Sequence, residues 1–328
     1  MTRSDRQAGL DKLNTRVRED LSYLTLPAKP WVPRQSYKGQ AVRDVVIIGA
    51  GMCGLAALAQ LRLAGIDNVV AYDHAAPGLE GPWITFARMR TLRSPKMLTG
   101  PALGLPALTF RAWYTAQFGA EAWDRLDKIP KEQWMDYLVW YRHILELPIE
   151  NEVRLLDIEA ATDALVALRL EDQSGTRTEY ARHLVLATGR SGLGGAYVPD
   201  FLDGLDPALW AHGADEIDFG SLKGKDVAVI GGGATAMDTA GMALERGAAS
   251  LCMLIRRKEM PQINKMTGIG SPGVVHGIRY LPDDWKWKFY DYVAKAQTPP
   301  PRSSTLRVSR HPNARCYLDC AVTGVRAA

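Results

Sequence analysis

The sequence has few of the residues that mark metalloproteins or disulfide-rich domains. It contains 4 cysteines and 6 histidines in 328 residues. Cys316 and Cys320 are separated by three residues and no histidine pair lies near them, so we expect neither a structural metal site nor a redox-active disulfide. So few cysteines are typical of a reducing compartment, and we expect a cytoplasmic protein.

The sequence also lacks a candidate transmembrane segment. The stretch Val45–Leu61 is almost wholly apolar, but it spans 17 residues, contains three glycines and has charged flanks. The N-terminus, with Arg3 and Asp5, lacks the apolar segment of a signal peptide. The net charge of +4 is too small to indicate nucleic acid binding, although it would help to attract a phosphorylated cofactor.

A strand, a glycine-rich turn and a helix follow one another near residue 50. Val45–Ile48 is β-branched, as in a buried parallel strand. Gly49, Gly51 and Gly54 then have the G-x-G-x-x-G spacing of a dinucleotide-binding turn. The first glycine permits the tight bend, the second lets the backbone approach a pyrophosphate, and the third packs the helix on the strand. The helix N-terminus, with Cys53 in its first turn, would bind the phosphates.

A second predicted strand, Val69–Tyr72, ends at Asp73, 24 positions after Gly49. An acid at this place accepts hydrogen bonds from the ribose of an adenosine group. The alternative, a packing turn without a ligand, does not account for strand, turn, helix and acid in register. The sequence therefore predicts a unit that binds a dinucleotide through an unmodified ribose.

The same arrangement recurs 182 residues later, after the predicted strand Asp226–Ile230. Alanine replaces the third glycine, an allowed variant. The candidate binding residues of this turn are Gly231, Gly233, Ala234, Thr235 and Ala236. Arg256 and Arg257 follow the next strand, where the first unit has its acid. Because arginine pairs with a 2′-phosphate, we interpret the first unit as FAD-binding and the second as NADPH-binding.

The loop after the ribose acid supplies further candidates. It contains Gly81-Pro-Trp83, and Trp83 is a candidate cofactor contact. Four cations follow within nine residues: Arg88, Arg90, Arg93 and Lys96. They would suit contacts to the diphosphate or the flavin ring, with Arg93 as the candidate, or else they belong to a solvated loop.

The predicted fold is α/β, with two Rossmann-like dinucleotide-binding domains and the NADPH domain inserted in the FAD domain. The predicted domains are an N-terminal helix and arm (1–40), the FAD-binding domain (41–205), the NADPH-binding domain (206–301) and a return to the FAD domain (302–328). The apolar stripe of the helix at 5–24 packs on the core or, alternatively, contacts a second copy in a homodimer. Val153–Tyr180 alternates like a β-meander, and His183–Gly189 is predicted as the next strand.

The order of these motifs resembles the class B flavoprotein monooxygenases, which include the flavin-containing and Baeyer–Villiger monooxygenases. The matching pieces span roughly residues 44–258 and are the first turn, Asp73, Gly81-Pro-Trp83, Ala187-Thr-Gly189 and the second turn with its two arginines. The resemblance implies that Thr188 and Gly189 lie near the nucleotide and the hinge between domains. It also implies that Val153 contacts adenine through its backbone.

The resemblance implies an enzyme that uses FAD, NADPH and O2. NADPH would reduce the flavin, reduced flavin would add O2 to give a C4a-(hydro)peroxide, and one oxygen atom would pass to a small organic substrate. Because the cofactor carries this chemistry, we nominate no catalytic side chain. We consider two alternatives, a non-catalytic nucleotide-binding relative or NADPH oxidase, and a pyridine-nucleotide–disulfide reductase, which would need a reactive cysteine pair beside the flavin.

The sequence departs from the family pattern in three places, of which the mildest is Asp73, where glutamate is commoner. The family fingerprint F-x-G-x-x-x-H-x-x-x-W/Y is not present, because His212 is accompanied by Asp206, Ala208 and Glu216. Family members also usually end with a second Asp-x-x-x-x-Ala-Thr-Gly-like strand and a helix. The chain stops at Ala328 with neither, so we expect that the usual C-terminal part is lacking.

Overall fold

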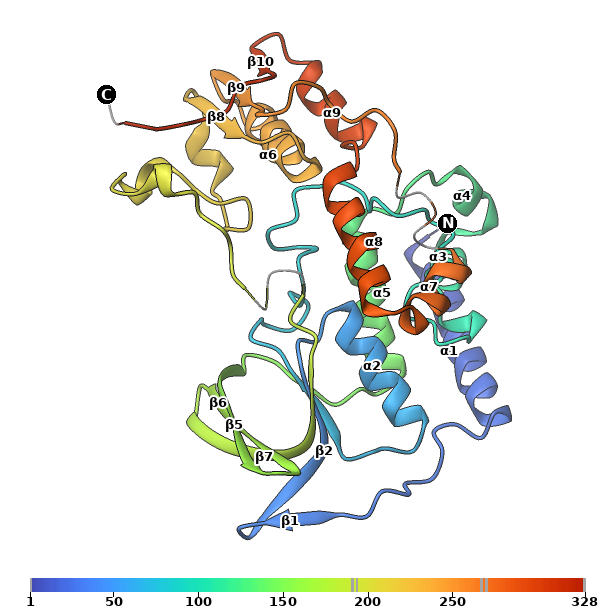
Figure 1. Cartoon of the computed structure of the whole chain (residues 1–328). Helices are drawn as coiled ribbons and strands as arrows, with labels where there is room; N and C mark the ends of the chain where they lie inside the picture. The colour runs from blue at the N-terminus through green and yellow to red at the C-terminus, as the bar shows by residue number, and fades with distance from the viewer. Residues whose placement is uncertain (1, 190–191, 193, 266–267, 269–270, 327–328) are drawn as a thin grey trace. The chain divides into compact units, whose positions relative to one another are not determined.

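The computed structural model describes residues 2–189, 192, 194–265, 268 and 271–326. The chain divides into two compact units, residues 1–195 and 196–328, and each combines helices with parallel strands (Figure 1). The predicted α/β class with two Rossmann-like units is confirmed. The division after Gly195 lies within the predicted FAD-binding domain, residues 41–205.

The first unit is built on one sheet, with strand order β4-β3-β2-β7-β6-β5. Its strands are β2 (Gln40–Ile48), β3 (Val69–Tyr72), β4 (Ile149–Glu150), β5 (Arg154–Thr162), β6 (Leu165–Asp172) and β7 (Gly175–Leu186), and β1 (Gln35–Tyr37) pairs antiparallel with β2. β3 and β7 both run parallel to β2. The helix α2 (Met52–Leu63) connects β2 to β3 and buries Leu55 and Leu58 against the sheet. The strand–turn–helix–strand order predicted around residue 50 is therefore confirmed.

The antiparallel meander and the parallel strands of the dinucleotide-binding motif share the long strand β7. Its first half pairs antiparallel with β6, and its second half pairs parallel with β2, where Leu186 lies opposite Ile48. The last part of the meander predicted at Val153–Tyr180 and the strand predicted at His183–Gly189 thus belong to one strand, which ends at Leu186. Leu168 and Leu170 of β6 pack against Val46 of β2, so the meander covers one face of the central strands.

The remaining helices of the first unit pack into one hydrophobic core with β2, β3 and α2. They are α1 (Arg3–Tyr23), η1 (Pro106–Leu108), α3 (Phe110–Phe118), α4 (Ala120–Arg125) and α5 (Lys131–Ile144). Thr2 caps α1, and Thr109 caps α3 by accepting a hydrogen bond from the Ala112 N–H. Val17 of α1 is buried in the same cluster as Trp134 of α5, so the N-terminal helix packs on the core of its own unit, as one of the two interpretations predicted.

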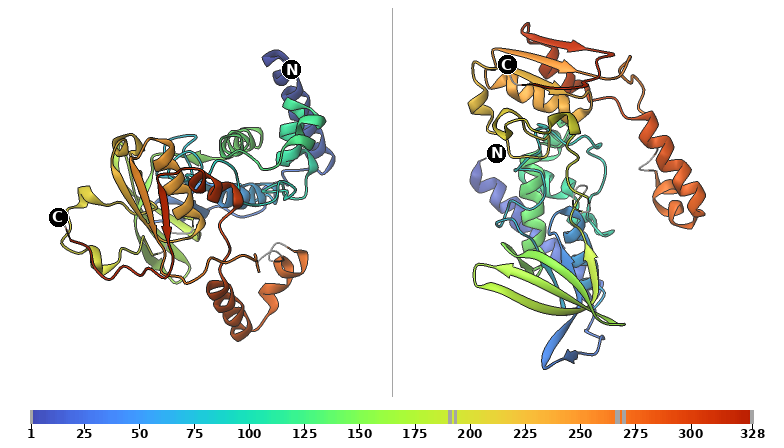
Figure 2. Two further views of the ribbon diagram at one scale, coloured as in Figure 1. Left: turned by 90° about the horizontal axis from the view of Figure 1, so that it is seen from above. Right: turned by 60° about the vertical axis from the view of Figure 1, so that its left-hand side comes forward.

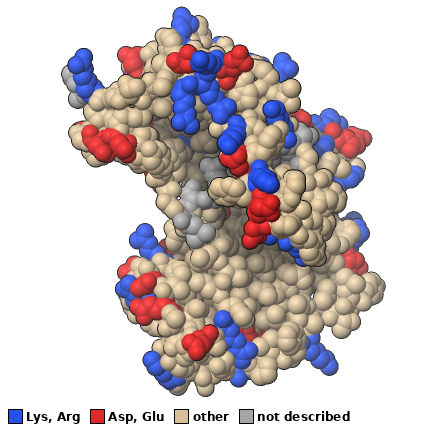
Figure 3. All heavy atoms as spheres, viewed as in Figure 1, with Lys and Arg blue, Asp and Glu red and all other residues tan. Residues whose placement is uncertain are grey.

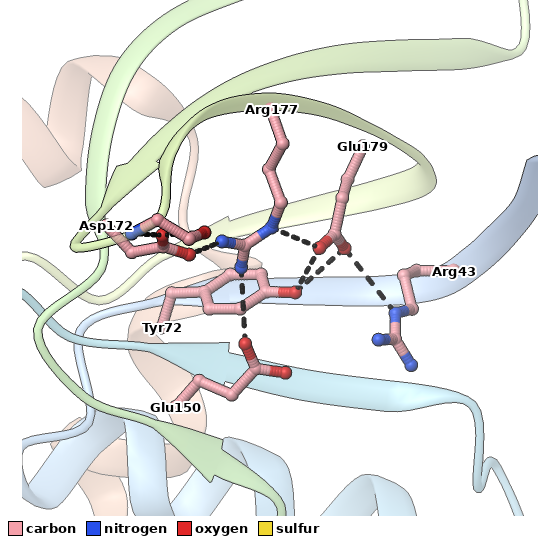
Figure 4. Close-up of polar contacts among 7 residues, drawn as sticks. Arg43, Tyr72, Glu150, Asp172, Arg177 and Glu179 are labelled. Atoms are coloured by element: carbon pink, nitrogen blue, oxygen red, sulfur yellow. Dashed lines mark hydrogen bonds and ion pairs between the residues drawn. The ribbon is translucent and has the colours of Figure 1, made fainter.

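A polar cluster on the sheet ties several strands together (Figure 4). Its members are Arg43, Tyr72, Glu150, Asp172, Arg177 and Glu179. The buried Tyr72 hydroxyl donates to Glu179, whose carboxylate oxygens lie 2.7 and 2.8 Å away, and Arg177 lies over the Tyr72 ring. Burial, and then the hydrogen bond to Glu179, raise the pKa of Tyr72 far above its ordinary value.

The second unit contains a parallel sheet of order β10-β9-β8 (Figure 2). Its main elements are β8 (Asp226–Ile230), α6 (Ala234–Glu245), β9 (Ser250–Leu254), α9 (Arg302–Ser309) and β10 (Ala314–Tyr317). Its other helices are η2 (Asp200–Leu202), η3 (Pro207–Leu209), η4 (Phe219–Leu222), α7 (Pro272–Gly277), η5 (Ile278–Tyr280) and α8 (Asp283–Ala296). The second predicted strand–turn–helix–strand repeat is confirmed.

The predicted return to the FAD domain at residues 302–328 is wrong for the part that the structure describes. α9 packs on α6, where Val308 joins the core formed with Ala240 and Met253. β10 then pairs parallel with β9. Local sequence could not show which unit this segment joins, because α9 and β10 contact residues that are distant in the sequence. No helix among the described residues is long and apolar enough to cross a membrane.

Candidate dinucleotide-binding sites

The first glycine turn is tightly constrained at Gly49. Its φ of +104° is a backbone conformation that residues with a side chain rarely adopt. Its N–H donates to the Tyr72 carbonyl at 2.7 Å, and a Cβ at Gly49 would lie 2.4 Å from the Ala187 carbonyl oxygen. The Ala187-Thr-Gly189 segment therefore packs directly on the turn, which places Thr188 beside it.

Positions 54 and 51 lack a side chain for different reasons. A Cβ at Gly54 would lie 1.8 Å from the Gly49 carbonyl oxygen, so this glycine is required by packing within the protein. A Cβ at Gly51 would meet only the Gly81 backbone, at an ordinary contact distance of 3.8 Å from its Cα. The protein's own packing thus does not require glycine at position 51, which fits a position where the backbone is approached by a ligand.

The N-terminus of α2 is open to an anion. Gly51 is the N-cap residue, and because it has no side chain it cannot accept from the N–H groups of the first turn. Cys53 lies in that turn and its side chain is exposed. These N–H groups and the positive end of the helix dipole suit a diphosphate.

Asp73 is buried at the carboxyl end of β3 and is hydrogen-bonded to the backbone of the turn. One carboxylate oxygen accepts from the Ala50 N–H at 2.7 Å, and the other accepts from the Ala75 N–H at 2.9 Å. Each carboxylate oxygen can accept a second hydrogen bond, so both can still bind ribose hydroxyls. Val153 is also buried, and its N–H donates to the Asp73 carbonyl at 3.0 Å, so this group is used within the protein.

Trp83 supplies a second feature that fits a ligand. Its indole Nε1 is buried, and no acceptor binds it in the part of the chain that the structure describes. The same nitrogen lies 3.5 Å from the position of a Cβ on Gly81, the residue that faces Gly51. A buried donor is costly without an acceptor, and a cofactor oxygen at this turn would supply one.

The four cations after Trp83 have different environments. Lys96 donates to the Trp123 carbonyl at 2.7 Å and lies over the Trp123 ring, so it belongs to the aromatic core. Arg88 is buried, which excludes a solvated loop for this residue. Arg93 is exposed, and its carbonyl accepts from the Lys128 ammonium at 2.9 Å.

The second turn has the same form but looser packing. Gly231 has φ +116°, and Gly233 is the N-cap of α6, with no heavy atom of the protein within 4 Å of its Cβ position. Ala236 takes the place of the third glycine, and its Cβ lies 3.8 Å from the Cβ position of Gly231. Ala234 and Thr235 form the first turn of α6. The helix stands far enough from the turn to accept alanine where the first unit needs glycine.

The two predicted phosphate-binding arginines lie at the carboxyl end of β9. Arg256 is exposed and Arg257 is half-buried. The Arg257 carbonyl accepts from the Asp319 N–H at 2.7 Å, which extends the pairing between β9 and β10 by a few residues. In Figure 3, basic side chains gather over the upper region, where β8, β9 and β10 lie in Figure 1, with acidic side chains among them.

Sequence reasoning missed three polar residues behind the first site: Glu80, Arg142 and Asn151. Arg142 donates to the buried Glu80 carboxylate at 2.5 Å, although 62 residues separate them. No local spacing joins these residues. The one available signal was the charge of Glu80 next to the Gly81-Pro-Trp83 motif.

Comparison with known proteins identifies the family. Residues 43–268 match the family described as pyridine nucleotide-disulphide oxidoreductase. The chain is 39% identical over 317 residues to an FAD-dependent urate hydroxylase from Xanthomonas campestris pv. campestris, covering 96% of this chain and 67% of that protein. The chain belongs to the class B flavoprotein monooxygenases. These monooxygenases are oxidoreductases, as the motifs predicted.

Solved structures share the fold of this monooxygenase. An ornithine hydroxylase from Pseudomonas aeruginosa matches with a TM-score of 0.71 and 15% identity, over 88% of this chain and 75% of that one. The ornithine N-hydroxylase of Kutzneria sp. 744, with reduced FAD, NADP+ and L-ornithine, matches with a TM-score of 0.63 and 17% identity, over 88% and 74%. All four cysteines of the present monooxygenase are free, and Cys316 and Cys320 lie on and after β10, in the second unit. The alternative of a pyridine-nucleotide–disulfide reductase, which would need a reactive cysteine pair beside the flavin, is not favoured.

Proposed function

We propose that the protein is an FAD- and NADPH-dependent monooxygenase that transfers one oxygen atom of O2 to a small planar heterocycle, with urate as the first candidate. The overall reaction converts substrate, NADPH, a proton and O2 into hydroxylated substrate, NADP+ and water. The observation that carries the proposal is the contrast between two similar turns, one followed by Asp73 and the other by Arg256 and Arg257. The hydroxylase relative, at 39% identity, supports the choice of urate.

The first unit would hold FAD. The N-terminus of α2 would bind its diphosphate across Gly51, Asp73 would bind the ribose, and Trp83 Nε1 would donate to the cofactor. When bound, FAD supplies the electron transfer from NADPH and the activation of O2. Thr188 lies beside the turn and Val153 beside Asp73, and these two residues are proposed with Gly189 as further contacts.

The second unit would hold NADPH. The N-terminus of α6 at Gly233 would bind the diphosphate, and Arg256 and Arg257 would bind the 2′-phosphate. Arg93 is proposed to contact the flavin ring or the diphosphate. A cytoplasmic location and a homodimer also remain predictions.

The test begins with purified protein reconstituted with FAD. Retention of the visible flavin spectrum after removal of free FAD is expected, and NADPH consumption should rise when urate is added. With isotopically labelled O2, one labelled atom should appear in the product. NADPH consumption that yields only hydrogen peroxide, with urate and with ornithine or lysine as comparison substrates, would instead indicate an NADPH oxidase.

A further inference from the structure

Three side chains form a buried polar network behind the first nucleotide site. Glu80 is 3% exposed, and Arg142 of α5 donates to its Oε1 at 2.5 Å. Asn151 donates from Nδ2 to the same oxygen at 2.7 Å, and its Oδ1 accepts from both terminal nitrogens of Arg142 at 3.3 Å. The single negative charge of Glu80 is therefore compensated by Arg142 inside the protein.

The network holds the loop between the ribose acid and Gly81. Oε2 of Glu80 accepts from the Gly78 N–H at 2.9 Å, and Gly78 has φ +86°. Nδ2 of Asn151 also donates to the Ala75 carbonyl at 3.0 Å, so Asn151 bridges the first part of the loop to Glu80. The loop is thus tied at both ends to α5 and to the segment after β4.

This loop is in direct contact with the phosphate turn. Asp73 at its start accepts from the Ala50 N–H at 2.7 Å. Gly81 at its end faces Gly51, and a Cβ on Gly51 would lie 3.8 Å from the Gly81 Cα, an ordinary contact distance. Ala50 and Leu55 line one small pocket together with Glu80 and Arg142, so the network lies immediately behind the turn.

We propose that Glu80, Arg142 and Asn151 are positioning residues for the adenosine diphosphate half of FAD. They touch neither phosphate nor ribose. They hold Asp73 and Gly81 at the separation at which Asp73 accepts from the ribose while Gly81 and Gly51 leave room for the diphosphate. The inference rests on the proposed FAD site in the first unit.

Glu80→Gln is the sharpest variant, because it keeps size and removes the charge. If the amide oxygen faces Gly78, the NH2 group faces the donors of Arg142 and Asn151. If the oxygen faces those donors, the NH2 group faces the Gly78 N–H. In either orientation the NH2 group faces at least one N–H donor, so the loop must shift. We expect the Kd for FAD to rise about tenfold or more, the effect of roughly one lost buried hydrogen bond to a charged group.

Binding of ADP and of FMN separates positioning from a general loss of structure. ADP carries the affected half of FAD, whereas FMN lacks the adenosine. Titrations well below the unfolding temperature should show weaker FAD and ADP binding by the Glu80→Gln variant, with FMN binding unchanged. Asn151→Leu, which removes the bond to Ala75 from a half-buried position, should behave in the same way if Glu80→Gln does not fold. Glu152→Gln, an exposed change in the same region, is the matched control and should bind FAD like the wild type.

The outcomes distinguish the two proposals. If the wild type itself binds no FAD, the proposed function fails. If the wild type binds FAD and both Glu80→Gln and Asn151→Leu retain its FAD and ADP affinities, the positioning role is overturned. A fall in unfolding temperature with unchanged affinity would also overturn it, because that result assigns the network to stability alone.

Discussion

The Tyr137 hydroxyl donates a 2.6 Å hydrogen bond to the Leu108 carbonyl, whereas the Tyr141 hydroxyl, one turn later on α5, is buried with no partner in the described part of the chain. Both rings are fully buried. We expect Tyr137→Phe to lower the free energy of unfolding by about 1–3 kcal/mol, because the Leu108 carbonyl is left without its donor. Tyr141→Phe should change it little or raise it, since it removes an unsatisfied polar group. Urea titration of the two variants makes the comparison, and equal losses would contradict it.

The same tyrosines predict sensitivity to alkali. Burial raises the pKa of Tyr137 and of Tyr141 far above the ordinary value. Above about pH 10 the unfolded chain releases these protons and the folded chain keeps them. The stability that comes from keeping them neutral is therefore fully present below pH 10 and falls by about 1.4 kcal/mol per pH unit for each tyrosine above it.

Tyr141→Phe should make this alkaline decline less steep. The check is the free energy of unfolding of the wild type and the variant at several values on both sides of about pH 10. Parallel curves would show that Tyr141 ionises as readily in the folded protein as in the unfolded chain.

Gly51 and Gly54 should respond differently to an added side chain. Gly54→Ala places a Cβ 1.8 Å from the Gly49 carbonyl oxygen and should destabilise the first unit by about 1–3 kcal/mol. Gly51→Val places a side chain where only the Gly81 backbone is near, so folding should survive while FAD binding is lost. NADPH affinity should be retained. Full flavin content in Gly51→Val would show that the first turn is not the FAD site.

Arg256 and Arg257 are expected to determine the choice between NADPH and NADH. A charge-assisted hydrogen bond to a 2′-phosphate contributes about 1.5–3 kcal/mol. Arg256→Ala and Arg257→Ala should therefore lose about tenfold to a hundredfold in NADPH affinity. NADH affinity should barely change. The ratio of the two dissociation constants is the measurement, and an unchanged ratio in both variants would exclude this role.

Arg307 should be important for the stability of the second unit. Its guanidinium, 7% exposed, donates to Asp238 at 3.1 Å and to both oxygens of Glu245 at 2.9 Å. Those carboxylates hold the pKa of Arg307 above its ordinary value in spite of burial. Arg307→Met leaves the buried Asp238 without this cation and should cost about 3–5 kcal/mol.

The matched control for Arg307 is Arg16→Met. Arg16 is 62% exposed, and its pair with Asp20 is 3.8 Å long, so the change should cost less than about 1 kcal/mol. Thermal unfolding of both variants tests the contrast. A similar loss in both would mean that the α6–α9 contact does not depend on the buried charges.

Local patterns predicted the elements that carry their own signals. Val45–Ile48, the glycine spacing and Asp73 lie within one stretch of chain. The sequence could not show that β7 is one strand. Its first half pairs with β6 and its second half with β2, so polar and apolar residues do not alternate in the same way in the two halves. It could not place Arg302–Ser309 either, since the contact of Arg307 with Asp238 joins residues 69 positions apart. The Glu80–Arg142 pair was missed for the same reason.

The position of β7 has a consequence for how the first unit unfolds. Tyr180 and Ala181 are paired on one side with Ala167 and Val166 and on the other with Val42 and Arg43. The meander cannot detach without breaking the strand that also completes the nucleotide-type sheet. We expect the amide hydrogens of β6, β7 and β2 to exchange with solvent at a common, slow rate in a single cooperative opening. Because β2 and β7 are distant in sequence, that cooperative unit should also form late and slowly when the chain refolds.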